Sequence, residues 1–587
     1  MAAMAKQLAE EPQRAVAPMR AALAACRRHW IAAAGFSALV NLLYIAPTLY
    51  MLQVYDRVVP TQGVQTLAFL TLVLLFALAC LSLLDRVRSR LLTRAGVVLN
   101  AALAPMVLDA TIGRPELPAA RSAVRDLDTM RATLTGPAML ALFDAPWTPI
   151  YVGVCFLVHP LIGALALAGG LILTLIAWRN EKATRAGLDR AQDVASQTYA
   201  AQDVMLSAAD SVRALGMRRA MVARQQRKRE AMLALQTESG LHAGGYFTAT
   251  KFVRLALQSL ALGLGAWLAV DNLISGGAIF AASFLIARAL APIELVIGSW
   301  KTLAQARTGY QELDRLLASA VARPEPTRLP APQGALTLEG LTIFNAARDA
   351  AVLNGISFAV APGEVVAIVG PSGAGKSTLL RAIVGALPVD RGAVRIDAAE
   401  IGDWDPERLA RHIGYLPQDS VLFEGTVKEN IARFEGELGA APEAVDAAVV
   451  AAADLVAARA LILRLPGGFD HRLGLNGRGV SAGQAQRIAL ARAVYGDPAL
   501  YVLDEPNAHL DSEGDVALNA AITQLKAAGK TILVVSHKLG VLPVVDKMLV
   551  LRDGRVELFG PRDEVLAKIA PPNVRRMVPA AQGGSAA

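Results

Sequence analysis

The stretch Gly370-Pro-Ser-Gly-Ala-Gly-Lys-Ser377 fills every fixed position of the phosphate-loop pattern G-x-x-x-x-G-K-[ST]. The apolar run before it, residues 365–369, has the β-branched character of a buried strand, and residues 378–384 after it have helical character. The glycines are therefore expected in a strand-to-helix turn, which is the context that the pattern requires. A chance glycine-rich turn would need neither flank, so the stretch predicts a nucleotide site.

The backbone of this loop, freed by glycine, can wrap a triphosphate with its N–H groups at the N-terminus of a helix. The Lys376 ammonium can reach the β- and γ-phosphates, and the Ser377 hydroxyl can ligate Mg²⁺. We expect ATP to be contacted by Gly370, Pro371, Ser372, Gly373, Ala374, Gly375, Lys376, Ser377 and Thr378.

Two acids, Asp504 and Glu505, follow an apolar strand-like run at residues 500–503. In a phosphate-loop fold such a strand lies beside the loop. Asp504 is then expected to hold Mg²⁺, and Glu505 to orient and deprotonate the attacking water. The alternative is a pair of solvated acids without a role. With the loop in place, we interpret the pair as a site of ATP hydrolysis.

Composition indicates that another part of the chain lies in a membrane. Of the 587 residues, 54% are hydrophobic and 18% are charged, which is too apolar for an ordinary soluble protein. Several runs reach the roughly 20 apolar residues that cross a bilayer. A soluble core could explain any one of these runs, but not six with consistent basic flanks. We expect six spans at about residues 30–55, 66–84, 140–158, 160–178, 252–271 and 276–298.

The charged residues predict the topology. The net charge is +8, and the Arg and Lys residues that border the apolar runs fit a membrane protein with its basic residues inside better than a nucleic-acid-binding protein. We therefore expect no nucleic-acid partner. Residues 1–29 contain no signal-type apolar region, so both termini are expected in the cytoplasm. The three cysteines lack the spacing of metal ligands.

Shifts in composition predict the domain boundaries. Prolines cluster at residues 323–332, and beyond them strand-like runs alternate with helical patterns, as in an α/β domain. Amphipathic stretches between the spans are typical of long cytoplasmic helices. We expect a cytoplasmic segment at 1–29, a helical transmembrane domain with cytoplasmic helical extensions at 30–318, a linker at 319–333, an α/β nucleotide-binding domain at 334–570 and a disordered tail at 571–587.

The segment Val480-Ser-Ala-Gly-Gln484 runs directly into a helical pattern and resembles the L-S-G-G-Q signature of ATP-binding-cassette (ABC) transporters, with Val for Leu and Ala for the first Gly. In the order of that family, Gln418 resembles the Q-loop glutamine, Asp511 the D-loop aspartate and His537 the switch histidine. The resemblance implies the type I ABC exporter fold, with Gln418 at the Mg²⁺ and with Gln418 and His537 as further catalytic residues beside Glu505.

The same resemblance implies a head-to-tail pair of cassettes. Ser481 and Gly483 of one copy would reach the γ-phosphate bound by the other copy, with Gln484 and Asp511 at the same nucleotide. A chain with one cassette and six spans is then a half-transporter that forms a homodimer.

Four segments that spread over nearly the whole chain are similar to the permease/ATPases of bacterial type I secretion: Met51–Pro60, Leu142–Tyr151, Arg288–Pro292 and Asp504–Asn507. The resemblance implies ATP-driven export of an unfolded polypeptide with a C-terminal signal across the bacterial inner membrane. It also implies a membrane-fusion adaptor and an outer-membrane channel as partners. Branches with a peptidase-like domain before the spans rank lower, because none precedes Trp30 in this sequence. An exporter of lipids or small amphipathic molecules is the alternative.

Three positions leave their roles open. Asn345 stands where the family usually has an aromatic that stacks on adenine, so the adjacent Phe344 is the candidate for this contact, with packing in an edge sheet as the alternative. Leu475 stands where exporters often have a glutamate. Arg288 falls near the middle of the sixth span, where a guanidinium facing lipid would cost at least about 2.5–3.5 kcal/mol. It is therefore expected to face the bundle interior, either pairing with polar groups or lining an export path.

Overall fold

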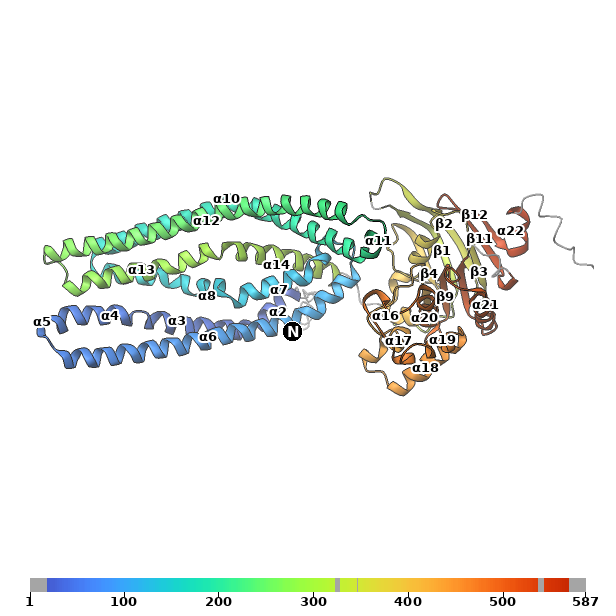
Figure 1. The fold of residues 1–587 in the computed structure, drawn as a ribbon, viewed down its shortest axis with the longest axis horizontal. Coiled ribbons are helices and arrows are strands. Elements are labelled where there is room, and N and C mark those ends of the chain that lie inside the picture. The colour runs from blue at the N-terminus through green and yellow to red at the C-terminus, as the bar shows by residue number, and fades with distance from the viewer. Residues whose placement is uncertain (1–17, 322–327, 346, 537–542, 570–587) are drawn as a thin grey trace, which may run out of the picture. The chain divides into compact units, whose positions relative to one another are not determined.

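The computed structural model of the chain describes residues 18–321, 328–345, 347–536 and 543–569. The chain divides into two compact units, Met1–Arg323 and Pro324–Ala587 (Figure 1). The first unit is helical and the second is α/β, so the predicted fold class is confirmed. Each unit is described by itself. The predicted tail at 571–587 and most of the segment 1–29 lie outside the described residues.

The first unit consists mainly of long helices joined by short turns. In chain order its helices are α2 (Pro18–Ala25), α3 (Arg27–Leu43), α4 (Ala46–Gln53), the π-helix η1 (Val54–Val58), α5 (Val59–Thr61), α6 (Val64–Gly113), the 3-10 helix η2 (Pro118–Arg121), α7 (Ala123–Thr135), α8 (Pro137–Asp144), the 3-10 helix η3 (Ala145–Trp147), α9 (Thr148–Val158), α10 (Pro160–Ser207), α11 (Ala209–Ala214), α12 (Arg218–Val270), α13 (Gly276–Gly298) and α14 (Trp300–Val321).

Six helical stretches of the described residues are long and apolar enough to cross a membrane. They are Arg27–Thr61, Val64–Gly113, Pro137–Val158, Pro160–Ser207, Arg218–Val270 and Gly276–Gly298. The second, fourth and fifth stretches continue without a break beyond the apolar run, and these continuations are the long polar extensions expected from the sequence. Helix α14 ends at Val321, three residues beyond residue 318, the expected end of the transmembrane domain.

The first outer turn is shorter than predicted. The first span was expected to end at about residue 55, but the helical path through η1 and α5 continues to Thr61. The reason is that Asp56 is bound by another helix. Its carboxylate accepts the Gly277 N–H at 2.6 Å and the Ser275 hydroxyl at 2.5 Å, at the start of α13. Because these hydrogen bonds satisfy the carboxylate within the protein, the chain does not need a longer turn that exposes Asp56 to water.

The third span is also broken where we expected one helix. Helices α8 and α9 are separated by the 3-10 turn η3, and the apolar stretch begins at Pro137 rather than at residue 140. Pro146 and Pro149 lie at the join. Proline has no N–H to donate to the preceding turn, so a regular α-helix cannot run through this point unchanged.

A polar cluster lies inside the first unit. Arg88 of α6 donates to the carboxylate of Asp144 and to the Ser37 hydroxyl, both at 2.8 Å. The Asn41 amide donates to the same carboxylate at 2.7 Å, and the Tyr151 hydroxyl donates to the Asn41 carbonyl at 2.6 Å. All five residues are buried. The polar cluster therefore joins α3, α6, α8 and α9 through groups that satisfy one another.

Arg288 of α13 extends the polar cluster. Its guanidinium lies 3.2 Å from the centre of the Tyr44 ring, and its Nη2 donates to the Asn41 side-chain oxygen at 3.4 Å. The expected position of Arg288 in the bundle interior is confirmed. A role along an export path stays a prediction.

The second unit is built on a six-stranded sheet and a smaller antiparallel sheet. Its strands are β1 (Leu336–Phe344), β2 (Ala351–Val360), β3 (Val365–Val369), β4 (Arg391–Ile396), β5 (Ala399–Glu400), β6 (Ile413–Leu416), β7 (Gly425–Thr426), β8 (Arg472–Leu473), β9 (Leu500–Asp504), β10 (Thr531–Val535), β11 (Lys547–Arg552) and β12 (Arg555–Pro561). Its α-helices are α15 (Lys376–Ile383), α16 (Pro406–Arg411), α17 (Val427–Ile431), α18 (Pro442–Leu455), α19 (Arg459–Leu463), α20 (Ala482–Val494), α21 (Ser512–Ala527) and α22 (Arg562–Ile569), with short 3-10 turns between them.

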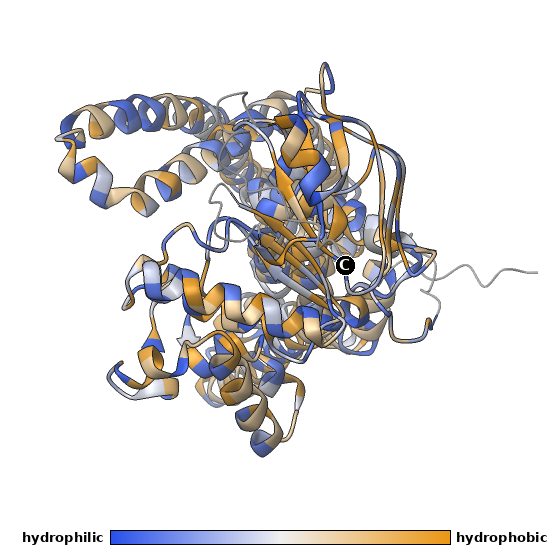
Figure 2. Cartoon of the chain, turned by 90° about the vertical axis from the view of Figure 1, so that its right-hand side faces the viewer, coloured by the Kyte–Doolittle hydropathy of each residue, from blue (hydrophilic) through white to orange (hydrophobic). Residues whose placement is uncertain are grey.

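The large sheet has the order β12-β11-β3-β10-β9-β6, and all of its pairs are parallel except β11 with β12. Its central strands are buried on both faces. Val365 and Ala367 belong to one hydrophobic core and Val366 and Ile368 to the other, as the alternation of a strand requires. Figure 2 shows mostly apolar strands among helices that alternate apolar and polar residues. The second sheet, β2-β1-β4-β5, is antiparallel.

Candidate active site

The phosphate loop, the two acids and Gln418 lie at one edge of the large sheet, where its parallel strands end. Strand β3 ends directly before the phosphate loop, β9 ends at Asp504, and β6 ends two residues before Gln418. Ligands of open α/β sheets bind at this carboxyl edge. Strand β10 lies between β3 and β9, so the two acids are one strand away from the loop strand and not directly beside it.

The loop needs glycine at two points. A Cβ atom on Gly370 would lie 2.1 Å from the Leu551 carbonyl oxygen. Gly375 has φ +96°, and a Cβ there would lie 2.7 Å from a methyl group of Leu353. Gly375 is also the N-cap of α15, so the unpaired N–H groups of that helix begin at the loop. A side chain at either position would clash with the neighbouring strands, so the backbone of the loop can take this path only with glycine there.

Lys376 begins α15 and is buried. Its ammonium donates to the carbonyl oxygens of Gly370 and Pro371 at 2.8 and 2.9 Å. The charge is therefore held by backbone carbonyls of the loop itself. Backbone groups are neutral, so the positive charge stays available to phosphate oxygens.

Asp504 and Ser377 meet at the same edge. Burial raises the pKa of the Asp504 carboxyl, and a hydrogen bond from the Ser377 hydroxyl opposes this effect. Asp504 is 2% exposed, and its Oδ1 atom has no hydrogen-bond partner among the described residues. The Ser377 hydroxyl also lies 3.5 Å from the side-chain oxygen of Gln418. The three predicted Mg²⁺ ligands are thus brought together.

These three residues offer a hydroxyl, an amide oxygen and a carboxylate. Such hard oxygen donors are the ligands that Mg²⁺ takes in nucleotide sites, together with phosphate and water. The buried Asp504 oxygen without a partner also fits a cation there, because a buried polar atom is normally satisfied. The residues present therefore fit Mg²⁺ bound with ATP.

Glu505 follows β9 in a left-handed conformation, with φ +50°. Its N–H donates to the Val535 carbonyl at 3.0 Å, which ties it to the end of the neighbouring strand β10. This conformation is uncommon for a residue with a side chain and clusters at functional sites. The fold places Glu505 at the sheet edge immediately after the metal-site acid. The other predicted catalytic residue, His537, lies outside the described residues.

The signature segment is a helix N-terminus. Ser481 is the N-cap of α20, and its hydroxyl accepts the Gln484 N–H at 3.3 Å while the Gln484 side chain accepts the Ser481 N–H at 2.8 Å. This capping box fixes the first turn. Gly483 lies in that turn, where a Cβ would approach the His509 carbonyl oxygen at 3.0 Å. The segment presents a helix N-terminus that can bind an anion.

Asp511 is the N-cap of α21. Its carboxylate accepts the Gly514 N–H at 2.8 Å and the Arg487 guanidinium at 2.6 Å. These two contacts, the backbone one first, lower the pKa of Asp511. Since Arg487 belongs to α20, the contact couples the D-loop to the signature helix.

Two positioning residues were missed from the sequence. Gln486 is fully buried in α20; it accepts the Ser420 hydroxyl near the Q-loop and donates to the Pro506 carbonyl at 3.2 Å. Asn507 donates to the Ser536 hydroxyl at 3.3 Å, next to the predicted switch position. Neither residue matches a phosphate-binding pattern in the sequence. Their burial and their hydrogen bonds in the fold show that they bridge the loops around Glu505.

Phe344 ends β1 and is half-buried. The Arg391 guanidinium lies 5.8 Å from the centre of the Phe344 ring. The backbone N–H of Phe344 donates to the Asp390 carboxylate at 2.9 Å. The assignment of Phe344 to adenine stays a prediction. Leu475 is largely exposed on the unit's surface.

Comparison with known proteins agrees with this geometry. The ABC transporter family matches residues 353–508, and the ABC transporter transmembrane region matches residues 120–291. The type I secretion system ATP-binding protein PrsD of Rhizobium meliloti is 40% identical over 556 residues, which cover 94% of each chain. The cyclolysin secretion/processing ATP-binding protein CyaB of Bordetella pertussis is 30% identical over 544 residues, 90% of this chain and 75% of that protein.

Among solved structures, a bacterial Atm1-family ABC exporter with ATP bound matches with a TM-score of 0.80 and 23% identity, covering 95% of this chain and all of that one. That likeness supports the fold of six spans and a cassette. The matches over nearly the full length give the family. The chain belongs to the ABC transporters and, within them, to the ATP-binding proteins of type I secretion systems.

Proposed function

We propose that this chain exports an unfolded polypeptide across the bacterial inner membrane and drives the export by ATP hydrolysis. One observation carries the proposal: the phosphate loop, Gln418 and the two acids lie at one sheet edge in a chain that matches type I secretion proteins over 90% or more of its length. The chain binds and hydrolyses ATP as an ABC ATPase.

Within the site, we assign Lys376 to the β- and γ-phosphates and the N–H groups of the loop to the remaining phosphate oxygens. Ser377, Gln418 and Asp504 would hold Mg²⁺, which neutralises charge on the phosphate oxygens when it is bound. Glu505 would take the proton of the attacking water, with His537 as the second catalytic group. The Ser377 hydroxyl lies 3.5 Å from the side-chain oxygen of Gln418 and lowers the pKa of the Asp504 carboxyl, which supports a shared role for these three residues.

The signature turn would complete the site of a second copy. Ser481, Gly483 and Gln484 form a helix N-terminus whose partial positive charge suits the γ-phosphate. Asp511 would position this turn through Arg487 of the same helix. One chain carries one loop and one signature, so a homodimer with two sites is the simplest complete enzyme.

The six apolar helices would place the chain in the inner membrane, with the nucleotide-binding unit and both termini in the cytoplasm. Type I secretion implies a periplasmic membrane-fusion adaptor and an outer-membrane channel as partners. The cargo would be a polypeptide recognised by a C-terminal signal. An exporter of lipids or small amphipathic molecules remains the competitor that the experiment has to exclude.

The test uses the full chain as a purified dimer in lipid nanodiscs, with phosphate release as the readout. The probe is an unfolded glycine-rich repeat polypeptide with a C-terminal secretion signal. The control is the same polypeptide without its C-terminal segment. We expect the first to change the rate of ATP hydrolysis saturably and the second to have no effect. Equal effects of both polypeptides, or a response to an added lipid or detergent alone, would contradict polypeptide export.

A further inference from the structure

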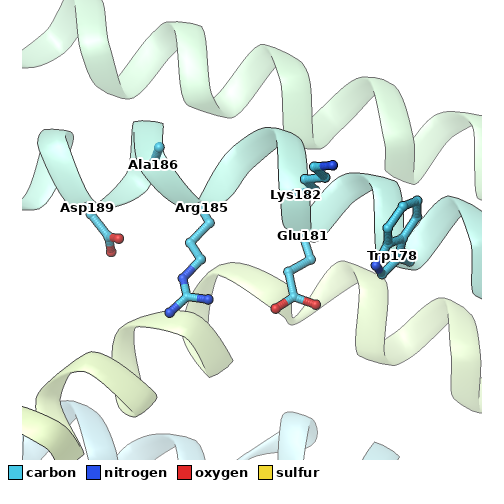
Figure 3. A pocket seen from close by; sticks show the side chains of 6 residues that line it. All are labelled: Trp178, Glu181, Lys182, Arg185, Ala186 and Asp189. Carbon is cyan, nitrogen blue, oxygen red and sulfur yellow. The ribbon is translucent and has the colours of Figure 1, made fainter.

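Polar side chains of α10 and α20 differ in what surrounds them. On α10, Glu181, Arg185 and Asp189 project from one helix to the same side (Figure 3), and the last two are exposed. Charged side chains on an exposed helix face are ordinary in proteins and need no ligand. On α20, by contrast, the side chain of Gln486 is fully buried. A buried amide is the more informative of the two, because it costs free energy unless hydrogen bonds satisfy it.

The two ends of the Gln486 amide contact different segments of the chain. Its NH₂ group donates to the Pro506 carbonyl at 3.2 Å and lies 3.5 Å from the Glu505 carbonyl oxygen. Carbonyl oxygens only accept, so this end of the amide is its NH₂ group and the other end is its oxygen. That oxygen accepts the Ser420 hydroxyl. Both ends of the amide are therefore used within the protein.

The two segments that Gln486 joins both carry residues of the nucleotide site. Ser420 lies two residues after Gln418, which we assign to Mg²⁺. Pro506 directly follows Glu505, which we assign to the attacking water. The amide of Gln486 thus connects the loop of a metal ligand with the loop of the general base.

The backbone of Glu505 has a conformation that its neighbours must hold. Its φ of +50° is uncommon for a residue with a side chain, and such conformations persist only where the surrounding structure fixes them. Its N–H donates to the Val535 carbonyl at 3.0 Å, and its carbonyl accepts the Ala508 N–H at 3.1 Å. The NH₂ group of Gln486 adds a contact from another element to this carbonyl and to the next one along the chain. Gln486 therefore helps to fix the turn that carries the base.

Asn430 shows what a buried amide does when it serves only its own turn. It is as fully buried as Gln486. Its side chain bonds to the backbone of Phe423 and Thr426, which lie seven and four residues away. The partners of Gln486 lie 66 and 20 residues away, in two separate loops. Asn430 shapes one local turn, whereas Gln486 relates two loops to each other.

We propose that Gln486 is a positioning residue for ATP hydrolysis, which holds the loop of Gln418 and the loop of Glu505 at one fixed separation. The inference rests on the proposed function, because it uses the roles assigned there to these two residues. Gln486 acts through the loops and not on the nucleotide itself. A misplacement of about 1 Å at a catalytic group can cost about 10²-fold in rate. Loss of the amide should therefore slow hydrolysis and leave ATP binding at the phosphate loop intact.

The test compares Gln486→Met with wild type in the full-length dimer, with phosphate release as the readout. Methionine is unbranched and of similar length but lacks the amide. We expect kcat to fall about 10–100-fold, the usual effect of removing a group that orients a metal ligand, while the affinity for ATP stays at the wild-type level. The Mg²⁺ concentration that gives the half-maximal rate should rise, because Gln418 is no longer held in place.

The matched control is Asn430→Leu, which removes another fully buried amide from the same unit. It should lower the unfolding temperature and leave kcat at the wild-type level, because its partners lie within one turn. Thermal unfolding of each variant separates a loss of stability from a loss of rate.

A further variant cuts only one end of the connection. Ser420→Ala removes a hydroxyl from a partly buried residue, so it tests the inference even if Gln486→Met does not fold. It should lower kcat by less than Gln486→Met does. The double variant Ser420→Ala with Gln486→Met should be no slower than Gln486→Met alone, because Ser420 acts through Gln486.

Several results would overturn the inference. A wild-type kcat in folded Gln486→Met or in Ser420→Ala would show that the connection does not set the rate. An equal loss of kcat in Asn430→Leu would show general loosening of the unit, and a parallel loss of ATP affinity in Gln486→Met would show a collapsed site. Losses that add up in the double variant would show that Ser420 does not act through Gln486.

Glu505→Gln, assayed beside these variants, separates this inference from the proposed function. If Glu505→Gln is inactive and Gln486→Met hydrolyses ATP at the wild-type rate, only the role of Gln486 is wrong. If Glu505→Gln itself hydrolyses ATP at the wild-type rate, the role assigned to Glu505 is wrong, and the inference loses its basis.

Discussion

The nucleotide site and the polar cluster treat buried charge in opposite ways. Lys376 is 7% exposed, and its partners are neutral carbonyls of its own loop, at 2.8 and 2.9 Å. Arg88 is 4% exposed, and its partners are the carboxylates of Asp144 and Asp85 and the hydroxyl of Ser37. The first charge is kept for a ligand, while the second is neutralised inside the protein.

The same contrast holds for the acids. Asp504 keeps a buried oxygen without a partner among the described residues, whereas Asp144 receives both Arg88 and Asn41. A buried charge is costly unless it is paired, so each region must be completed differently. The nucleotide site is completed by what it binds, and the polar cluster is completed by folding. Removing a charge should therefore impair binding or turnover in one region and stability in the other.

The largest effect is expected from Glu505→Gln, which removes the general base and keeps the shape of the side chain. We expect the rate of ATP hydrolysis to fall about 10²–10⁴-fold, the usual contribution of a general base, while ATP binding persists. Phosphate release and a nucleotide-binding titration on the purified dimer measure the two quantities. Glu443→Gln, an exposed acid on α18, is the matched control and should behave as wild type. Hydrolysis by Glu505→Gln at the wild-type rate would remove the role assigned to this residue.

Arg88→Ala should destabilise the membrane unit by about 3–5 kcal/mol, because Asp144 is left as an uncompensated buried charge. Thermal unfolding of the purified protein, followed by loss of the monodisperse peak, measures the effect. Arg86→Ala, an exposed neighbour on the same helix, should change little. The double variant Arg88→Ala with Asp144→Ala should lose less than the sum of the single variants. If the losses of stability in the two single variants simply added up in the double variant, Arg88 and Asp144 would not stabilise the unit through their interaction with each other.

Lys376→Ala also removes a buried positive charge, here from the nucleotide site, and should impair ATP binding rather than stability. We expect ATP affinity to fall about 10–100-fold, the worth of one charge-assisted hydrogen bond or two, with little change in unfolding temperature. Lys568→Ala on α22 removes an exposed lysine from the same unit as a control. If Lys376→Ala lowered stability as much as Arg88→Ala, the contrast between the two regions would be lost.

The smallest effect is expected from Phe344→Ala. If its ring stacks on adenine, ATP affinity should fall about tenfold or less, since a stacked aromatic contributes about 0.5–1.5 kcal/mol beyond its burial. A titration with ATP against the half-buried Phe469→Ala as control measures the difference. Unaltered affinity in a folded variant would mean that Phe344 packs in the antiparallel sheet and that the base is held elsewhere.

The parts of the predicted nucleotide site are local in the sequence. The loop, the two acids and the signature turn are each encoded within a few residues, and the parallel strands bring their ends to one edge. Gln486 escaped prediction because its partners, Ser420 and Pro506, become neighbours only through packing.

The membrane unit was predicted in outline because apolar length is a local property of the sequence. Its details were missed because they depend on contacts between residues that are distant in the chain. Apolar length gave six spans, and the bounds of α13 match the sixth, 276–298. The continuation of the first span past Asp56 depends on its contact with Gly277, 221 residues later in the chain. Arg288 could be placed in the interior from the cost of lipid exposure alone, but its partners Tyr44 and Asn41 could not be named.

Secretion itself tests most directly whether hydrolysis at this site drives polypeptide export. Cells that produce the chain with an adaptor, an outer-membrane channel and the repeat polypeptide described above are assayed for that polypeptide in the medium. Wild type and Glu443→Gln should release it, and Glu505→Gln should release none although the protein is equally abundant in the membrane. Release by Glu505→Gln at the wild-type rate, or no release by wild type when all partners are present, would contradict ATP-driven polypeptide export by this chain.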